Sequence, residues 1–348
     1  MNKNHTRIDN LISEYMVILS RLPIIDLGAE LKVISALKVS NELLFLMRNL
    51  NINPYERISE VIDNEINCLK GINFSKGHRK NATRTSHDES VSATRKLYET
   101  IWTIYNNETY DHSMQLCLKR FEANGFDKKF FSGKVVFDGG CGTGRFCVAA
   151  ALMGARKVYG MDLGEQSLDF AKNKAKEYQI DHSVEFIEGD VTNLDKFPDN
   201  FFDLVVSNGV LHHTIDPTKG LSEHYRVLKL KGIMWLYLYG KNGLLWKVYG
   251  VLKDILKDVG AGFTSSFLLK LEIRQGLIYS FMDNVFAPIR NYYNTSEVLT
   301  MLREVGDFYC KDMRGINFLD DYTQQINSEY GRDLLGEECE VRQLIVKK

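Results

Sequence analysis

The sequence has no long run of apolar residues. A helix that spans a membrane needs about 18 consecutive, mostly apolar residues, and no stretch of this 348-residue chain approaches that length. The first residues, MNKNHTRIDNLISEY, mix charged and apolar side chains and lack the continuous apolar core of a secretory signal. We therefore expect a protein without a transmembrane segment, located in the cytoplasm.

Closely spaced cysteine pairs are missing as well. No CxxC motif occurs, so the sequence offers no ligand spacing typical of zinc, and scattered cysteines are typical of reduced thiols. We expect no bound metal. The six cysteines are Cys68, Cys117, Cys141, Cys147, Cys310 and Cys339.

Neither sign of charge is in excess. The 44 Lys and Arg residues face 45 Asp and Glu, a net charge of -1, so no global positive field is available to hold a phosphate backbone. One local exception is the basic tract Lys76–Lys96, which we interpret first as a solvated linker. Nucleic acid is therefore an alternative partner and not the favoured one.

The first third of the chain has the apolar spacing of helices. From Thr6 to Gly71 apolar residues recur every three or four positions, with a break at Pro23. We predict an N-terminal helical region at residues 1–71 and a polar linker at 72–90. Two further helices are expected within 91–130, a segment that we interpret as a helical cover of the active site.

Strands and helices alternate after Gly133. Short apolar strand candidates are separated by stretches long enough for helices, a pattern typical of a mostly parallel sheet covered on both faces. We predict an α/β fold with a Rossmann-like sheet of seven strands. The domain would span 131–348 and carry a helical lid insert at 240–293, after the fifth strand. Asn294 and Glu297 have the spacing of a capping box at the start of a later helix.

A glycine-rich turn follows the first predicted strand. The segment VVFDGGCGTGR runs from Val135 to Arg145, and Gly140, Gly142 and Gly144 let the backbone turn tightly and approach a ligand. The third glycine comes one residue earlier than in the dinucleotide fingerprint GxGxxG, and the acid Asp138 ends the strand. This argues against a nicotinamide-dependent oxidoreductase.

Three further signals lie at the ends of later strands. Asp162 ends the second strand and can accept hydrogen bonds from ribose hydroxyls, although a helix cap is an equal alternative. Asp190 follows the third strand, and SNGVLHHTIDP follows the fourth, from Ser207 to Pro217. Because ligands bind outside the carboxyl ends of parallel strands, we expect all these positions to converge.

These four ordered motifs resemble those of class I S-adenosylmethionine (AdoMet) dependent methyltransferases. In the segment from Lys134 to Tyr239 the chain is similar to the small-molecule group that includes the ubiquinone and menaquinone C-methyltransferases. Members usually carry Pro-Gly where Leu230-Lys231-Gly232 stands here. The resemblance implies AdoMet as cofactor, S-adenosylhomocysteine as product and a small organic acceptor.

The resemblance also implies a role for each matching residue. One group would surround the methionine part of AdoMet, a second would meet the ribose and adenine, and a third would line the crevice by the sulfonium. The first group is Asp138, Gly140, Cys141, Gly142 and Gly144; the second is Asp162, Leu163, Asp190 and Val191; the third is Asn208, Gly209 and Val210.

Two histidines at the predicted reaction end are candidates for proton transfer. His212 and His213 follow the fourth strand, and histidine titrates near neutral pH. Each is a candidate general base or acceptor-positioning group, and a local hydrogen bond that fixes the loop is the alternative for either. An aromatic set is the candidate lid or acceptor surface, with a core role as the alternative: Tyr98, Trp102, Tyr105, Tyr110, Tyr239 and Trp246.

Three functions remain open from the sequence. The first is methyl transfer to oxygen, nitrogen or carbon of a small molecule, since alignment of a nucleophile behind an activated methyl supplies most of the catalysis. The second is an AdoMet-dependent enzyme that modifies tRNA, for which the Lys76–Lys96 tract would hold phosphates. The third is an AdoMet-binding protein without transfer activity. The acceptor and the oligomeric state are not encoded in any motif.

Overall fold

The chain forms two compact units, each assembled from three separate segments. The computed structural model describes residues 3–72, 87–102, 106–317, 320–338 and 340–348. We call residues 1–85, 241–287 and 322–339 the helical unit, and residues 86–240, 288–321 and 340–348 the sheet unit. Most of the expected linker at 72–90, together with Tyr105, lies outside the described residues.

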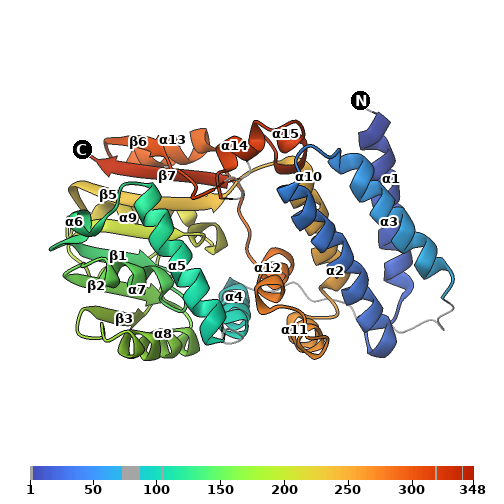
Figure 1. The fold of residues 1–348 in the computed structure, drawn as a ribbon, viewed down its shortest axis with the longest axis horizontal. Helices are drawn as coiled ribbons and strands as arrows, with labels where there is room; N and C mark the ends of the chain where they lie inside the picture. The colour runs from blue at the N-terminus through green and yellow to red at the C-terminus, as the bar shows by residue number, and fades with distance from the viewer. Residues whose placement is uncertain (1–2, 73–86, 103–105, 318–319, 339) are drawn as a thin grey trace. The chain divides into compact units, whose positions relative to one another are not determined.

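A seven-stranded sheet is the framework of the sheet unit (Figure 1). The strand order is β3-β2-β1-β4-β5-β7-β6; β1 to β5 pair in parallel, and β7 runs antiparallel to β5 and β6. This confirms the predicted mostly parallel, Rossmann-like sheet. All five residues of β1 are buried, as expected for a central parallel strand covered on both faces. The strands are β1 Val135–Gly139, β2 Lys157–Asp162, β3 Val184–Glu188, β4 Phe202–Asn208, β5 Leu228–Tyr239, β6 Phe308–Asp312 and β7 Glu340–Lys347.

Helices cover both faces of this sheet. On one face the rings of Phe121 in α5 and Phe146 in α7 pack edge-on or tilted against Trp235 of β5. On the other face the core contains Leu221 of α9 and Leu302 of α13. The expected capping box at the start of α13 is present. The helices of the sheet unit are α4 His87–Trp102, α5 Asn107–Ala123, α6 Lys128–Phe131, α7 Arg145–Leu152, α8 Glu165–Glu177, the short 3₁₀ helix η1 Leu211–His213, α9 Pro217–Val227 and α13 Thr295–Val305.

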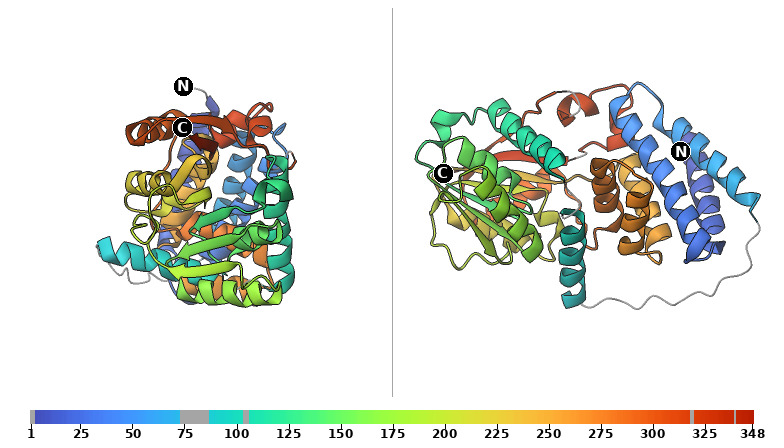
Figure 2. Two further views of the ribbon diagram at one scale, coloured as in Figure 1. Left: turned by 90° about the vertical axis from the view of Figure 1, so that its left-hand side faces the viewer. Right: turned by 60° about the horizontal axis from the view of Figure 1, so that its bottom comes forward.

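The helical unit combines the N-terminal helices with the insert after β5. Figure 2 shows α10 to α12, in brown, beside the blue α1 to α3, and the Ser40 and Tyr249 hydroxyls, 3.2 Å apart, join α2 to α10. The backbone N–H of Tyr330 also donates to the carbonyl of Leu50. The helices are α1 Lys3–Arg21, α2 Asp26–Arg48, α3 Pro54–Lys70, α10 Gly243–Leu256, α11 Ala261–Lys270, α12 Gln275–Phe286, α14 Tyr322–Ile326 and α15 Gly331–Leu335.

This grouping differs from the sequence expectation for residues 240–293. We expected those residues to be a lid insert within a single domain at 131–348, whereas the contacts group 241–287 with the N-terminal helices. The physical reason is the apolar face of α10, where Leu245, Val248 and Leu252 are buried. An amphipathic helix is stabilised by whichever apolar surface covers that face, and sequence periodicity does not name the partner.

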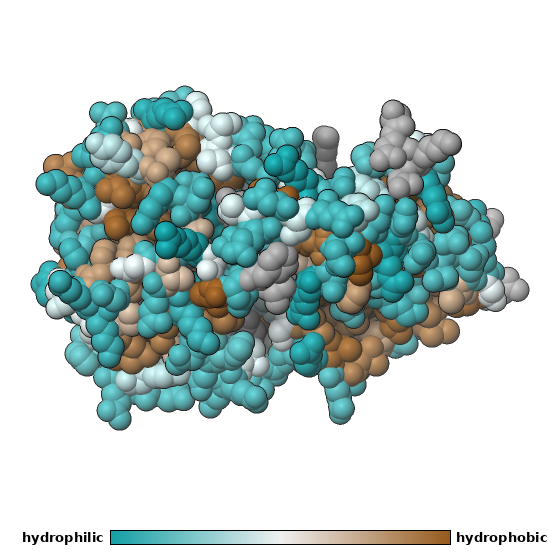
Figure 3. All heavy atoms as spheres, turned by 45° about the horizontal axis from the view of Figure 1, so that its top comes forward, coloured by the Kyte–Doolittle hydropathy of each residue, from teal (hydrophilic) through white to brown (hydrophobic). Residues whose placement is uncertain are grey.

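Exposed apolar side chains gather in the helical unit. Among the described residues, most of the large apolar side chains that stay exposed belong to this unit, and Figure 3 shows brown surface over its part of the view. Within the helical unit, the most exposed of these side chains are Ile25 and Leu27 at the start of α2, at 65% and 57%. No described helix is both long enough and apolar enough to span a bilayer.

Candidate functional site

The glycine-rich turn between β1 and α7 is bound to the end of β2. The backbone N–H groups of Gly140 and Cys141 both donate to the carbonyl of Met161, at 2.7 and 3.0 Å. Gly140 has φ +74°, and a Cβ on it would lie 2.4 Å from Val210. Only glycine fits there, because both the conformation and the space exclude a side chain. The turn thus brings the first and fourth sequence motifs into contact.

Asp162 closes the turn from the second strand. Its two carboxylate oxygens accept the backbone N–H groups of Gly142 and Gly164, at 2.8 and 2.9 Å. Desolvation raises its pKa in spite of these donors. The alternative of a helix cap is wrong, because the N-cap of α8 is Gly164, which makes no side-chain cap. Each carboxylate oxygen keeps a second lone pair, which a ribose hydroxyl can use.

Asp138 lies beneath the turn and is almost fully buried. It is 3% exposed, and the thiol of Cys147 donates to its Oδ2 at 3.3 Å. Burial raises the pKa of this carboxyl to about 7. The carboxyl therefore changes charge close to neutral pH, in a place where water does not solvate it.

Asp190 stands beside Asp162 at the end of β3. The N–H of Gly189 donates to the carbonyl of Asp162 at 3.0 Å, which joins the two strand ends. The Asp190 side chain is exposed and accepts the N–H and the hydroxyl of Thr192, while Val191 is buried. Leu163 is partly exposed next to Asp162. The predicted positions from the second and third motifs are therefore adjacent.

The loop after β4 carries both histidines and is braced by Asn291. The backbone N–H of Asn291 donates to the carbonyl of His212, and its side chain donates to that of Thr214, both at 2.9 Å. Gly209 has φ +77° and donates its N–H to Tyr237 of β5. Sequence reasoning missed Asn291, since it lies about 80 residues from the loop it holds and belongs to no motif.

His212 is a neutral, fully buried side chain. Its Nδ1 accepts the backbone N–H of Tyr239 at 3.2 Å, and burial, together with the charge of His213, lowers its pKa well below the ordinary value. The proton of the neutral ring is therefore on Nε2, and this buried atom has no hydrogen-bond partner among the described residues. His212 can donate a hydrogen bond there but is a poor base.

His213 has the opposite tautomer. Its Nδ1 lies 2.8 Å from the carbonyl of Ile289, and since a carbonyl can only accept, Nδ1 carries the proton. In the neutral ring the basic lone pair is then on Nε2. The two neighbouring imidazoles, 4.1 Å apart between centroids, thus offer one donor and one acceptor.

The aromatic candidates divide between the histidines and the core. The ring of Tyr98 lies 5.4 Å from His213, and Tyr239 stacks on His212 at 3.8 Å. Tyr110 is instead fully buried against Phe170 of α8 and is a core residue. The side chain of Trp102 is not among those described, like Tyr105. Trp246 lies on α10 in the helical unit, and its place in a lid stays a prediction.

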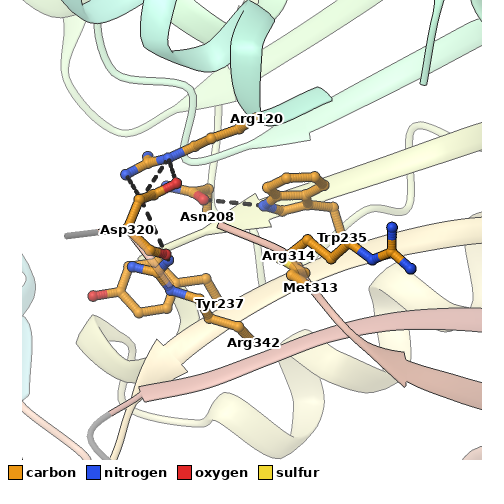
Figure 4. Close-up of a pocket in the computed structure, with 8 residues that line it drawn as sticks. All are labelled: Arg120, Asn208, Trp235, Tyr237, Met313, Arg314, Asp320 and Arg342. Atoms are coloured by element: carbon orange, nitrogen blue, oxygen red, sulfur yellow. Dashed lines mark hydrogen bonds and ion pairs between the residues drawn. The ribbon is translucent and has the colours of Figure 1, made fainter. Parts of the chain in front are cut away.

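A small pocket opens beside Asn208 on the face covered by α5 (Figure 4). The Asn208 side chain accepts the indole N–H of Trp235 at 3.0 Å. The guanidinium of Arg120 forms an ion pair with the carboxylate of Asp320, with a nitrogen–oxygen distance of 2.6 Å. Sequence reasoning found none of the charged residues here, because they come from three distant segments. The lining residues are Arg120, Asn208, Trp235, Tyr237, Met313, Arg314, Asp320 and Arg342.

Two other predictions from the sequence, on metal binding and on the basic tract, can be compared with the described residues. Within the described residues no group of three or more His, Cys, Asp or Glu side chains could hold a metal ion. Of the basic tract, residues 87–96 are described, and there Arg95 pairs with Glu188 at 2.8 Å and with Glu99 at 3.5 Å. One cation of the tract is therefore engaged within the protein.

The glycine turn fits the adenosyl cofactor that the motifs imply. The turn carries no side chain at Gly140, where a Cβ would meet Val210, and two buried polar atoms of the first and fourth motifs, Thr143 Oγ1 and His212 Nε2, have no partner among the described residues. Buried polar atoms usually find hydrogen-bond partners, so such atoms in the two motifs are typical of a ligand site.

Comparisons with known proteins agree with this assignment. The family model "Methyltransferase domain" matches residues 137–236. A demethylmenaquinone methyltransferase of Lactobacillus johnsonii is 32% identical over 31% of this chain and 48% of its own length. A malonyl-[acyl-carrier protein] O-methyltransferase of Yersinia pestis is 35% identical over 30% of this chain and 36% of its own length. The chain thus spans about half or less of the curated relatives that it matches.

A solved structure from Thermotoga maritima shows a weaker likeness. It is described as a SAM-dependent methyltransferase, possible histamine N-methyltransferase, and is 18% identical, covering 73% of this chain and 99% of that one, with a TM-score of 0.44. The fold assignment rests instead on the strand order, and the family on the matched motifs. On that basis residues 137–236 form a methyltransferase domain of the class I AdoMet-dependent type, whose cofactor is S-adenosylmethionine.

Proposed function

We propose that this chain transfers the methyl group of AdoMet to a small organic acceptor, at an oxygen, nitrogen or carbon atom. The observation that carries the proposal is the placement of the Asp162 carboxylate, which accepts N–H groups of the glycine turn and of its own loop. In the proposed complex Asp162 would meet the ribose, and the glycine turn would meet the methionine part of AdoMet. Relatives named for a quinone precursor and for an acyl-carrier protein support methyl transfer without selecting an acceptor.

The residues at the end of β4 would align the acceptor. AdoMet, when bound, supplies a methyl group on a positively charged sulfur, so the protein has no electrophile to generate. The N–H on His212 Nε2 would orient the acceptor, and His213 Nε2 would take its proton when attack requires one. The rings of Tyr98 and Tyr239 beside the histidines would exclude water from this place.

Calorimetric titration with AdoMet, S-adenosylhomocysteine and NADH tests the proposal. We expect micromolar binding of the first two ligands and none of NADH. In Asp162→Asn the affinity should fall roughly 100-fold, because two charge-assisted hydrogen bonds to the ribose are weakened. Asp169→Asn, which changes an exposed acid on α8, is the matched control and should bind like the wild type.

An acceptor screen that detects S-adenosylhomocysteine then separates the alternatives. Turnover with a small molecule supports the proposal. Tight AdoMet binding without turnover on any acceptor, tRNA included, would favour a binding protein, and turnover on tRNA alone would favour the RNA-modifying alternative. Binding of NADH alone would overturn the proposal.

A further inference from the structure

The start of β5 departs from the pattern of similar methyltransferases and forms a bulge. Leu230-Lys231-Gly232 stands where those proteins usually carry Pro-Gly. Residues 229–232 of β5 bulge out opposite the single β4 residue Asp203. The Leu230 side chain at this bulge is 64% exposed. The departure therefore places an apolar side chain in solvent between two lysines.

Lys231 has a backbone conformation that suits glycine. Its φ is +61°, in the left-handed region, which is unfavourable for a residue with a Cβ. Its side chain is exposed and forms no ion pair with any described residue. A lysine that strains the backbone and makes no compensating contact within the described fold indicates a role outside that fold.

Further basic side chains lie around this bulge. Lys229 and Lys134 share the carboxylate of Asp203, at 3.1 and 3.7 Å. The backbone N–H of Arg156 donates to the carbonyl of Lys134. Helix α6, which precedes Lys134 in the chain, carries two exposed lysines. Figure 1 shows α6 and the C-terminus at the end of the sheet where β5 begins.

A second exposed apolar side chain lies at the same edge of the sheet. Tyr309 of β6 is 65% exposed, and the Nζ of Lys348 lies 4.3 Å from its ring centroid. Because β7 is antiparallel to β5, it ends where β5 begins, and Val346 is opposite both Ile233 and Tyr309. Leu230 and Tyr309 are the two most exposed large apolar side chains described in the sheet unit.

Positive charge is in excess at this edge, which we call the basic edge. It comprises the starts of β1, β2, β5 and β6, the end of β7, and α6. Seven cations and three anions lie there, an excess of four positive charges in a chain whose net charge is -1. The nearby pairs Lys157–Glu185 and Arg226–Asp199 cancel. The cations are Lys128, Lys129, Lys134, Arg156, Lys229, Lys231 and Lys348, and the anions are Asp127, Asp203 and Asp307.

We propose that the basic edge attaches this protein to the surface of an anionic lipid bilayer. Leu230 enters the boundary between headgroups and acyl chains, and Tyr309 lies at the level of the headgroups, where tyrosine is favoured. The lysines around them face the negative charge of the lipids. Nucleic acid has the same sign of charge, but its phosphate backbone offers no apolar phase to Leu230.

This attachment directs the cofactor turn away from the bilayer. Asp138 and Asp162 lie at the carboxyl ends of β1 and β2, at the edge of the sheet opposite the basic edge. An acceptor would therefore reach the turn from water. The inference does not depend on the proposed function, because none of the residues of the basic edge belongs to the predicted cofactor site.

Flotation of the full chain with lipid vesicles tests this proposal. We expect binding to vesicles of equal parts phosphatidylglycerol and phosphatidylcholine, and binding at least tenfold weaker to phosphatidylcholine alone. Leu230→Ser should lower the affinity roughly tenfold, and Lys231→Gln roughly fivefold. Two matched controls should bind like the wild type: Leu271→Ser, at an exposed leucine of the helical unit, and Lys219→Gln, at an exposed lysine of α9.

Lys231→Gly separates lost charge from a damaged fold. Glycine adopts φ +61° without strain, so the melting temperature of this variant should equal or exceed that of the wild type. Its affinity for anionic vesicles should nevertheless fall as in Lys231→Gln. Wild-type affinity in both variants would contradict the role of the lysine.

Other outcomes would overturn the proposal and indicate a different surface or partner. Equal binding to both kinds of vesicle, or a loss of binding in Leu271→Ser and not in Leu230→Ser, would exclude the basic edge as the attachment surface. Binding of tRNA that Lys231→Gln weakens, without binding of vesicles, would indicate a nucleic-acid partner. AdoMet titration is a separate measurement, so a failure of either proposal leaves the other standing.

Discussion

Replacing Asp138 by asparagine should stabilise the protein at neutral and alkaline pH while it weakens cofactor binding. Burial raises the pKa of this carboxyl from 3.8 to about 7. The folded protein therefore holds the proton more tightly than the unfolded chain, and the ionised carboxylate costs stability as the pH rises from about 4 to 7. This difference in pKa between the unfolded and the folded state lowers the free energy of unfolding by at most about 4 kcal/mol above pH 7. Asparagine has nearly the same shape and does not ionise.

Thermal unfolding without cofactor, followed from pH 4 to pH 8, measures this effect. The melting temperature of Asp138→Asn should exceed that of the wild type by several degrees at pH 8, and the gap should shrink toward zero near pH 4. Asp169→Asn, at an exposed position, should show no such gap. A variant that melts at or below the wild type at pH 8, or a gap independent of pH, would refute the argument. The affinity of the wild type for AdoMet should fall as the pH drops below about 7. The reason is that a protonated, neutral Asp138 no longer attracts the ammonium group in the methionine part of AdoMet.

Two other substitutions test the remaining parts of the site. Gly140→Ala should abolish detectable AdoMet binding, because a Cβ at φ +74° would lie 2.4 Å from Val210. Calorimetric titration measures the affinity, on a variant whose circular dichroism spectrum matches that of the wild type. An affinity near that of the wild type would contradict the argument. His213→Gln should lower kcat by roughly 100-fold or more while AdoMet affinity is unchanged, provided that the acceptor loses a proton during attack. Equal kcat in the variant and in the wild type over the full pH range would exclude His213 as the base.

The sequence could predict which residues lie together at the ends of β1 and β2, because these residues belong to local motifs. A strand, a glycine turn and a helix follow one another within 11 residues from Val135 to Arg145, so the chain order itself places Asp138 and Gly140. Asp162 was found by the same reasoning one strand later. The strands and the capping box at Asn294 were also predictable, because each depends on neighbours within a few residues.

The rest depends on contacts between distant segments. The carboxylate of Asp320 meets Arg120 from 200 positions away, and Asn291 reaches the loop of His212 from another segment. Burial of α10 against the N-terminal helices likewise needs a partner that periodicity does not specify. Apolar spacing tells which face of a helix is covered but gives no information on what covers it.

The segmented build of the two units has a consequence for how the protein is made. Six alternating segments mean that the polypeptide passes from one unit to the other five times. Strand β7 lies between β5 and β6, so β6 has no strand to pair with until residues 340–347 have been synthesised. Neither unit is encoded by one continuous stretch of the gene. A recombination event that exchanged one unit would therefore have to exchange the other unit with it.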